Sequence, residues 1–146
     1  MNKIIIAIPR GRITKECKKI LSKTSFAPDP MLFDKETRKL KFKSKDKSIE
    51  YIKVRAFDAC TFVAFGAAQI GIAGEDVIKE FNYSEVYAPL DLNIGHCKIS
   101  VAAVKNLIKK ENPDTWSNIR VATKYPNITK KFFAAKGIQT EIIKLS

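Results

Sequence analysis

The residues best suited to chemistry in this sequence are arginines and glycines that come directly after short apolar runs. One such run ends at Pro9 and leads into Arg10, Gly11 and Arg12, and another ends just before Arg55. Backbone N–H groups at a helix start point towards an anion, and an arginine fork matches phosphate oxygens. These turns therefore suit phosphate binding, although the first turn taken alone is equally compatible with a purely structural connection.

No constellation of residue types indicates nucleophilic or metal catalysis. The single histidine, His96, stands beside Cys97 with no third ligand cluster, and no Ser-His-Asp or Cys-His arrangement is recognisable. Three cysteines without a C-x-x-C pair indicate neither a disulfide framework nor a zinc site. We therefore expect Cys17, Cys60 and Cys97 to be core or near-core thiols.

Hydrophobic periodicity places the arginines and glycines between strands and helices. The alternation of the two element types predicts an α/β fold with a largely parallel sheet. Asp58 is expected to be the N-cap of the helix that follows Arg55. Strands are predicted at residues 3–8, 38–43, 49–54, 69–74, 87–91, 99–104, 119–123 and 138–145, and helices at 14–24, 58–65, 75–81, 113–116 and 125–136.

Length and composition suit one ordinary domain or two small lobes. The chain has 146 residues, of which 45% are hydrophobic, and the composition shifts at residues 88–97. We therefore predict a first α/β lobe at 1–90 and a partial second lobe at 91–146. No apolar run could cross a bilayer and no signal peptide is recognisable, so a cytoplasmic protein without a membrane partner is expected.

The formal net charge of +12 has two readings. It indicates either a polyanionic partner or simply a lysine-rich chain. Five lysines alternate between residues 39 and 47, which is typical of the solvated face of a strand. No nucleic-acid-binding motif is present and the aromatic residues fall at core-like positions, so a nucleic acid is not the expected partner.

Five stretches, in order, resemble motifs of the ATP phosphoribosyltransferase family, the first enzyme of histidine biosynthesis. The first is similar to a strand and "P-K-G-R" turn, and the second to "R-K-L". The third is similar to "V-R-A-x-D … G-A-A-D-L-G-I-x-G-x-D-V", the fourth to "L-D-L … C-K/R" and the fifth to "R-I-A-T-K-Y-P-N". These stretches are residues 6–12, 38–40, 54–58 with 66–77, 91–92 with 97–98, and 120–127.

The resemblance implies a two-lobed α/β fold similar to type II periplasmic binding proteins. It implies transfer of a phosphoribosyl group from phosphoribosyl pyrophosphate (PRPP) to N1 of ATP, with release of pyrophosphate and with Mg²⁺ bound to the substrate phosphates. It also implies the short form of the enzyme. That form is a homo-oligomer that works with a regulatory subunit resembling a histidyl-tRNA synthetase.

The sequence departs from the family pattern at its end. The family continues through a "G-S-V-E" segment to a "D-x-V-x-T-G-x-T-L" loop that grips the 5-phosphate of PRPP, and then returns to the first lobe. The sequence given stops at Ser146, so the second lobe and return segment are expected to be incomplete. Gln69 replaces Asp, Ala59-Cys60 replaces Val-Pro, and Arg10 replaces Lys. A truncated non-catalytic module that binds nucleotide or docks on a partner is therefore the alternative function.

The resemblance also implies roles for individual residues. Arg55 is the candidate that stabilises the leaving pyrophosphate, against the alternative of a salt bridge to Asp58. Arg38 is a second catalytic candidate, reaching the site from its own hairpin or from a neighbouring subunit. Asp76 could equally be a plain acid at a helix start, and Tyr125 could equally be a packing residue. No residue is expected to bind metal directly, and the nucleotide-binding candidates are Arg10, Gly11, Arg12, Gly71, Gly74, Asp76, Thr123, Lys124 and Tyr125.

Overall fold

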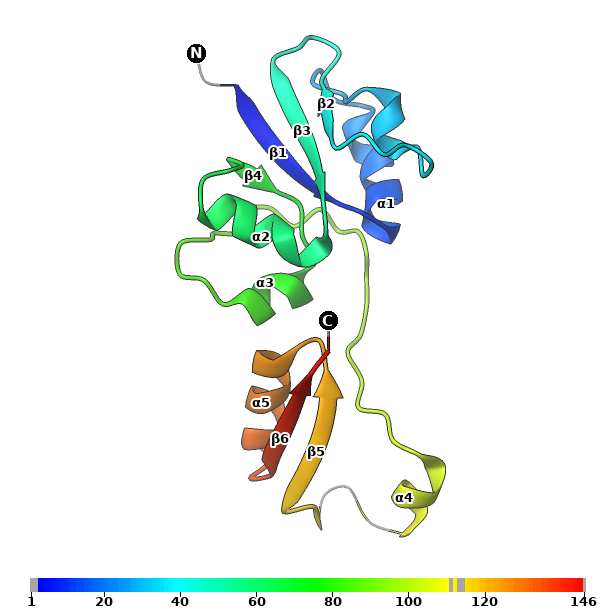
Figure 1. Cartoon of the computed structure of the whole chain (residues 1–146), viewed down its shortest axis with the longest axis vertical. Coiled ribbons are helices and arrows are strands. Elements are labelled where there is room, and N and C mark those ends of the chain that lie inside the picture. The colour runs from blue at the N-terminus through cyan, green and yellow to red at the C-terminus, as the bar shows by residue number, and fades with distance from the viewer. Residues whose placement is uncertain (1–2, 111, 113–114, 146) are drawn as a thin grey trace. The chain divides into compact units, whose positions relative to one another are not determined.

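The computed structural model describes residues 3–110, 112 and 115–145, which form two compact units, 1–96 and 97–146 (Figure 1). The first unit contains β1 (Ile4–Pro9), α1 (Arg12–Leu21), η1 (Pro30–Phe33), β2 (Lys41–Lys43), β3 (Ile49–Val54), α2 (Ala56–Ala64), β4 (Ile70–Gly71) and α3 (Glu75–Phe81). The second contains α4 (Lys105–Lys110), β5 (Asn118–Thr123), α5 (Pro126–Ala134) and β6 (Gln139–Lys144).

The first unit is built on a four-stranded sheet with the order β2-β3-β1-β4. β1 is parallel to β3 on one side and to β4 on the other, and β2 is antiparallel to β3. The predicted hairpin and the largely parallel sheet are therefore confirmed. Two of the predicted strands are shorter than expected, because β2 covers Lys41–Lys43 rather than 38–43 and β4 covers Ile70–Gly71 rather than 69–74. β1 is almost continuously apolar because both faces of the strand are covered, as is typical of parallel sheets in α/β proteins.

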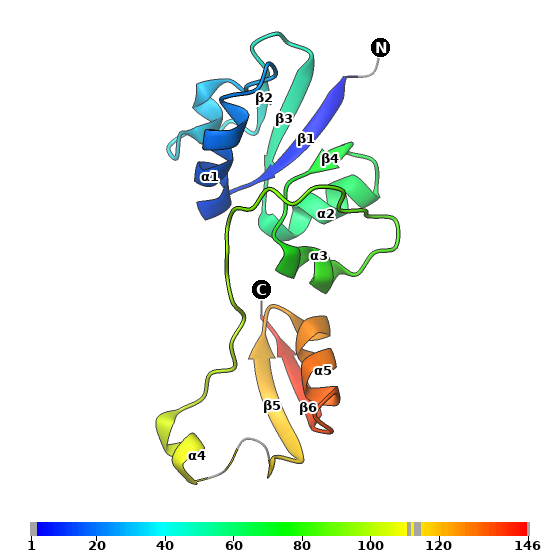
Figure 2. The ribbon, with the colours of Figure 1, turned by 180° about the vertical axis from the view of Figure 1, so that it is seen from behind.

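A different helix covers each face of this sheet. Ile6 and Ile8 of β1 pack with residues of α1 and with Tyr51 of β3 in one buried cluster. Ala7 packs with residues of β3 and α2 in the other cluster. Because successive side chains of a strand point to opposite faces, α1 and α2 lie on opposite sides of the sheet, as the two ribbon views show (Figures 1 and 2).

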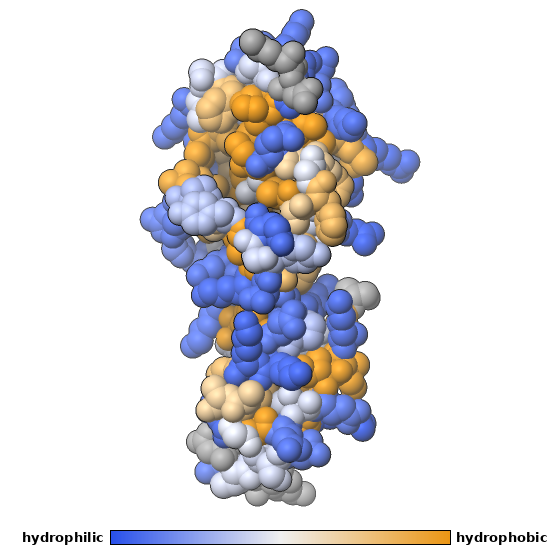
Figure 3. Space-filling model, turned by 90° about the vertical axis from the view of Figure 1, so that its left-hand side faces the viewer, coloured by the Kyte–Doolittle hydropathy of each residue, from blue (hydrophilic) through white to orange (hydrophobic). Residues whose placement is uncertain are grey.

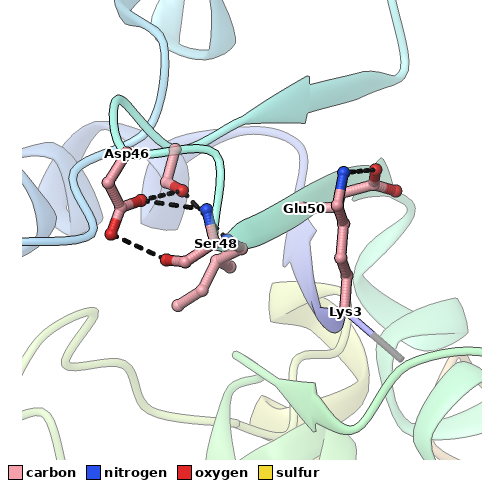
Figure 4. Close-up of polar contacts among 6 residues, drawn as sticks. Lys3, Asp46, Ser48 and Glu50 are labelled. Carbon is pink, nitrogen blue, oxygen red and sulfur yellow. Dashed lines mark hydrogen bonds and ion pairs between the residues drawn. The ribbon is translucent and has the colours of Figure 1, made fainter. Parts of the chain in front are cut away.

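The tip of the β2–β3 hairpin is fixed by one carboxylate. Asp46 accepts hydrogen bonds from the Ser44 hydroxyl at 2.5 Å, from the Ser48 hydroxyl at 2.7 Å and from the Ser48 backbone N–H at 3.1 Å (Figure 4). These bonds lower the pKa of the Asp46 carboxyl. Along β2 the side chains of Lys41 and Lys43 are exposed, which confirms that the lysine alternation marks a solvated strand face.

The second unit is smaller. β5 and β6 pair in parallel, from Asn118 opposite Gln139 to Thr123 opposite Lys144, and α5 connects them. Phe133 of α5 is buried, and the exposed Arg120 and Glu141 side chains form an ion pair across the strands at 2.9 Å. The predicted strand–helix–strand order is confirmed here.

Several helix predictions need correction. α1 begins at Arg12 and ends at Leu21, not at 24, because the Thr24 hydroxyl and backbone N–H both donate to the Leu21 carbonyl and end the helix. Asp58 is not an N-cap. Arg55 occupies that position, and Asp58 lies in the first turn, where its charge favours the helix dipole. The helical piece expected at 113–116 lies partly outside the described residues, and the sequence did not reveal η1 or α4.

The two strands expected at 87–91 and 99–104 do not form. Tyr87 and Leu90 are 84% and 73% exposed, and the described residues provide no neighbouring strand for either segment. An alternating pattern is a local signal, whereas a strand also needs a partner for its backbone groups. Cys97 is likewise exposed rather than in the core, while Cys17 and Cys60 are buried as predicted.

Some apolar surface is left uncovered on the first unit. The space-filling view shows it on the side of β4 and α2 (Figure 3), and the large apolar residues exposed in this unit include Ile4, Phe65 and Ile70. β4 is the edge of the sheet. Within the described ranges, no helix is both long enough and apolar enough to cross a membrane.

We expect Tyr51→Phe to destabilise the first unit. The Tyr51 ring is fully buried and its hydroxyl donates to the Phe26 carbonyl at 2.6 Å, so its removal should lower the free energy of unfolding by about 1 kcal/mol.

Burial, with a smaller contribution from the Asp46 charge, raises the pKa of Tyr51 to about 12. The unfolded chain therefore loses this proton first as pH rises, and stability should fall between about pH 10 and 12.

Urea unfolding of the wild type and of Tyr51→Phe at pH 7, 10 and 11.5 measures both effects. The variant should show a smaller alkaline loss than the wild type. Tyr87→Phe is the control, because this tyrosine is 84% exposed. An equal alkaline loss in all three proteins would contradict the assignment.

Candidate functional site

The candidate site lies at the carboxyl ends of the three parallel strands of the first unit. Pro9 pairs with Val54 in the β1–β3 register, and the backbone N–H of Arg10 donates to the Val54 carbonyl at 2.8 Å. Arg10 and Arg55 are therefore the first residues after two neighbouring strands, and their backbones lie side by side. In open α/β sheets, ligands bind in the crevice outside such strand ends, where connections to opposite faces separate.

The turn after β1 is shaped by one glycine. Gly11 has φ 110° and ψ −144°, and it is the N-cap of α1 with no side-chain cap. This backbone region is essentially restricted to glycine. A Cβ built on Gly11 would meet nothing within 4 Å, so the requirement comes from the backbone rather than from packing. The first N–H groups of α1 are thereby left without a side-chain partner, beside the exposed Arg10 and Arg12.

The turn after β3 presents a second arginine in the same way. Arg55 is exposed, has an extended backbone and is the N-cap of α2 without a side-chain cap. Its carbonyl accepts from the Asp58 backbone N–H at 3.0 Å. Among the residues described, the Arg55 guanidinium forms no ion pair, so the salt bridge to Asp58 that was the alternative role is absent.

Arg38 precedes β2 and lies towards the same end of the sheet. Lys41 pairs with Ile52, and the Lys53 backbone N–H donates to the Leu40 carbonyl at 2.8 Å. Because the strands are antiparallel, moving back from Leu40 to Arg38 corresponds to moving forward along β3 towards Arg55. The hairpin therefore directs this exposed arginine to the carboxyl end of β3 from its own chain.

The two glycines after β4 have different surroundings. A Cβ on Gly71 would lie 2.9 Å from Val63 Cγ2 and 3.3 Å from the Ala59 carbonyl oxygen, so this glycine lets α2 approach the sheet. Gly74 is the N-cap of α3, and a Cβ there would collide with Oδ1 of Asp76. Asp76 is half-buried in the first turn of α3. α3 packs against α2, whereas the connection after β1 leads into α1 on the other face of the sheet (Figure 1).

In the second unit the candidates stand together where β5 ends and α5 begins. The Thr123 hydroxyl accepts a hydrogen bond from the Tyr125 backbone N–H at 3.0 Å and lies 3.3 Å from the Thr129 hydroxyl. Lys124 is exposed, and Tyr125 is the half-buried N-cap of α5. This is again a strand–turn–helix connection with a cation in the turn.

One contact near the site had no signal in the sequence. Glu16 of α1 accepts a hydrogen bond from the Gly95 backbone N–H at 2.8 Å, and Ile94 packs on the core cluster that includes α1 residues. Gly95 has φ +70°, and its Cβ would lie 3.3 Å from Ile13. The end of the first unit is thereby held on α1, by residues 79 positions apart in sequence.

The two buried thiols of this unit are poorly suited to nucleophilic chemistry. Burial raises the pKa of the Cys17 thiol to about 11 and also raises that of Cys60, which disfavours the reactive thiolate form. No group of three or more histidine, cysteine or acidic residues in the described ranges could hold a metal ion. What the edge offers is positive charge and backbone N–H groups, which suit an anion.

The fold and these turns define an α/β protein of the class that binds ligands at the carboxyl ends of parallel strands. A family model, HisG: ATP phosphoribosyltransferase, matches residues 55–146. The chain belongs to the ATP phosphoribosyltransferase family, as its motifs predicted. This family consists of glycosyltransferases of histidine biosynthesis.

Individual relatives of the chain are also ATP phosphoribosyltransferases. The chain is 52% identical over 145 residues to the ATP phosphoribosyltransferase of Rhodospirillum rubrum, covering 99% of this chain and 64% of that protein. It is 52% identical over 143 residues to that of Rhizorhabdus wittichii, covering 98% and 65%. The chain thus spans slightly less than two thirds of the length of these relatives.

A solved structure shows the fold. The chain resembles one in the ATP phosphoribosyl transferase (HisG:HisZ) complex from Thermotoga maritima with a TM-score of 0.60 and 24% identity, covering 97% of this chain and 63% of that one. This likeness confirms the mixed α/β, periplasmic-binding-protein-like fold predicted from the motifs.

Gly11→Ala should destabilise the protein by about 1–3 kcal/mol, because alanine would be held in a backbone region that only glycine adopts readily. Gly66→Ala is the matched control. Gly66 has φ +73° and equally open surroundings, so its replacement should cost about 1 kcal/mol, the smaller left-handed penalty. Chemical denaturation of both variants measures the difference. Equal losses would show that the Gly11 turn is not constrained as described.

Proposed function

We propose that this chain provides the nucleotide side of an ATP phosphoribosyltransferase, which transfers phosphoribosyl from PRPP to N1 of ATP and releases pyrophosphate. The observation that carries the proposal is the placement of Arg10, Arg12 and Arg55 at the carboxyl ends of neighbouring parallel strands, in a chain that belongs to this family. Both substrates are polyanions, and arginines that form no ion pair within the described part of the chain, standing beside helix N-termini, favour such ligands.

The reaction requires positioning and charge stabilisation rather than a protein nucleophile. The bond from the anomeric carbon to the pyrophosphate oxygen breaks, and N1 of adenine supplies the electron pair for the new bond to that carbon. Positive charge builds on the ribose ring and negative charge on the leaving pyrophosphate. We assign stabilisation of that leaving group to Arg55, with Arg38 as a second cation, because an arginine fork fits phosphate oxygens.

The remaining candidates would hold the nucleotide. In the first unit, the turn at Gly11 with its two arginines would contact phosphate or ribose, and Gly74 and Asp76 would lie beside it. The proposal treats residues 1–90 as the nucleotide-side lobe and 91–146 as part of the second lobe. From that second lobe we assign contacts to Thr123, Lys124 and Tyr125. Gly71 remains a candidate beside the nucleotide, and its lack of a Cβ also lets α2 approach the sheet.

The metal requirement of the reaction is assigned to the substrates. Phosphoribosyltransferases generally need a divalent metal ion, and the described residues do not form a site for one. We therefore assign no protein residue as a metal ligand. We propose that Mg²⁺ enters with the substrate phosphates, since this ion typically retains waters and binds through phosphate oxygens.

The proposal extends to partners and location. The similar Thermotoga maritima structure is a HisG:HisZ complex. We infer that this chain works as a homo-oligomer with a HisZ-like regulatory subunit, one resembling a histidyl-tRNA synthetase, and in the cytoplasm. The alternative of a non-catalytic module that binds nucleotide or docks on a partner uses the same sheet edge, and family membership does not favour it.

Replacing Arg55 with alanine should weaken pyrophosphate binding by about 10- to 100-fold, since a charge-assisted hydrogen bond contributes about 1.5–3 kcal/mol. ATP binding should change much less if Arg55 serves the leaving group. Isothermal titration calorimetry of the 146-residue chain with each ligand measures both affinities. Arg120→Ala is the charge-matched control, because Arg120 pairs with Glu141 in the other unit.

The same substitution separates the proposed roles in turnover. In a longer version of the protein that is active, Arg55→Ala should lower kcat for pyrophosphate release with little change in the KM for ATP. A change confined to KM would argue against the leaving-group role. Binding of ATP by a longer version that shows no PRPP-dependent turnover would favour the non-catalytic alternative.

A further inference from the structure

We propose that Thr14 is a positioning residue that holds the turn from Pro9 to Arg12 in its anion-binding form. The proposal rests on the proposed function, because it concerns how the same sheet edge is kept ready for phosphate. Thr14 itself does not touch the ligand. Its role would be to keep the Gly11 turn and the first N–H groups of α1 in place.

The observation is a buried hydrogen bond that spans the turn. The side chain of Thr14 is buried, and its hydroxyl donates to the carbonyl of Pro9, the last residue of β1. Threonine within a helix commonly bonds to a carbonyl three or four residues earlier in the same helix. Here the acceptor lies five residues earlier and outside α1, so the bond ties the helix to the strand.

A second bond holds the other side of the turn. The Arg10 backbone N–H donates to the Val54 carbonyl at 2.8 Å, which anchors the exit of β1 to β3. Between these two bonds stands Gly11, with φ 110° and open space around it. Packing therefore does not restrain this glycine, and the bond from Thr14 supplies a restraint that the open turn lacks.

This restraint should matter for affinity more than for folding. A ligand that binds a preorganised turn does not have to order it, and the cost of ordering is subtracted from affinity. If the Thr14 hydroxyl is removed, the helix start can move relative to Pro9, and the N–H groups would no longer converge with Arg10 and Arg12. The bond is thus placed to couple the strand end to the anion site.

The matched control is on the same helix. Thr24 follows the other end of α1, and its hydroxyl donates to the Leu21 carbonyl at 2.7 Å. Thr14→Val and Thr24→Val each remove one hydroxyl that donates to a main-chain carbonyl. A purely structural role predicts that both lower stability and that neither changes ligand affinity in the folded protein.

The experiment measures ATP binding by calorimetry on the 146-residue chain, because the nucleotide is the ligand assigned to this turn, with stability from urea unfolding. Thr14→Val should weaken binding about tenfold, a typical effect of lost preorganisation. Thr14→Ser keeps the hydroxyl and should bind within about twofold of the wild type, and Thr24→Val should bind as the wild type does. Thr14→Ala carries the same prediction if the valine variant does not fold, and sucrose can be added to favour the folded state.

The outcomes separate this inference from the proposed function. A wild-type chain that does not bind ATP would overturn the proposed function and this inference with it. A wild type that binds, together with a folded Thr14→Val or Thr14→Ala that binds equally well, would overturn the inference alone. So would an equal loss of affinity in Thr24→Val, because that loss would reflect general destabilisation.

Discussion

The parallel pairing of β1 with β3 on one side and with β4 on the other is the interaction on which the first unit depends. It places three strand ends at one edge of the sheet, so that the turns after Pro9, Val54 and Gly71 are neighbours. The apolar residues of β1 make this possible because both faces of the strand are buried against helices. Without this pairing, arginines far apart in sequence would have no common location.

The electrostatics of the chain follow from where its cations are held. The lysines of β2 are exposed along the solvated hairpin, where salt screens them. The arginines at the strand ends instead stand beside helix starts that no side chain caps. A general positive charge attracts polyanions of any kind, whereas cations fixed beside uncapped backbone N–H groups can discriminate. The proposed transfer reaction needs this second kind of charge.

Much of the local structure could be predicted from the sequence. The strand at 3–8, the hairpin and the helix at 75–81 all have strong periodic signals and form as predicted. The two missing strands failed because strands need distant partners, whereas the helix ends were misplaced by local hydrogen bonding and capping. The segments 87–91 and 99–104 alternate as strands do but find no neighbouring strand in the described chain, and Asp58 gives way to Arg55 at the N-cap because α2 starts directly after β3. The sequence also could not reveal the hydrogen bonds that hold the turns, because these depend on tertiary geometry.

The central claim is that phosphate groups bind at the carboxyl ends of the parallel strands of the first unit, and not at the lysine-rich β2–β3 hairpin. A ¹⁵N–¹H NMR titration of the chain with inorganic pyrophosphate tests it most directly. The account predicts that chemical-shift changes concentrate on the backbone amides of Gly11, Arg12, Arg55 and Ala56, and that they saturate together. Changes that centre on residues 41–47, or that spread evenly over the lysines without saturating, would contradict it.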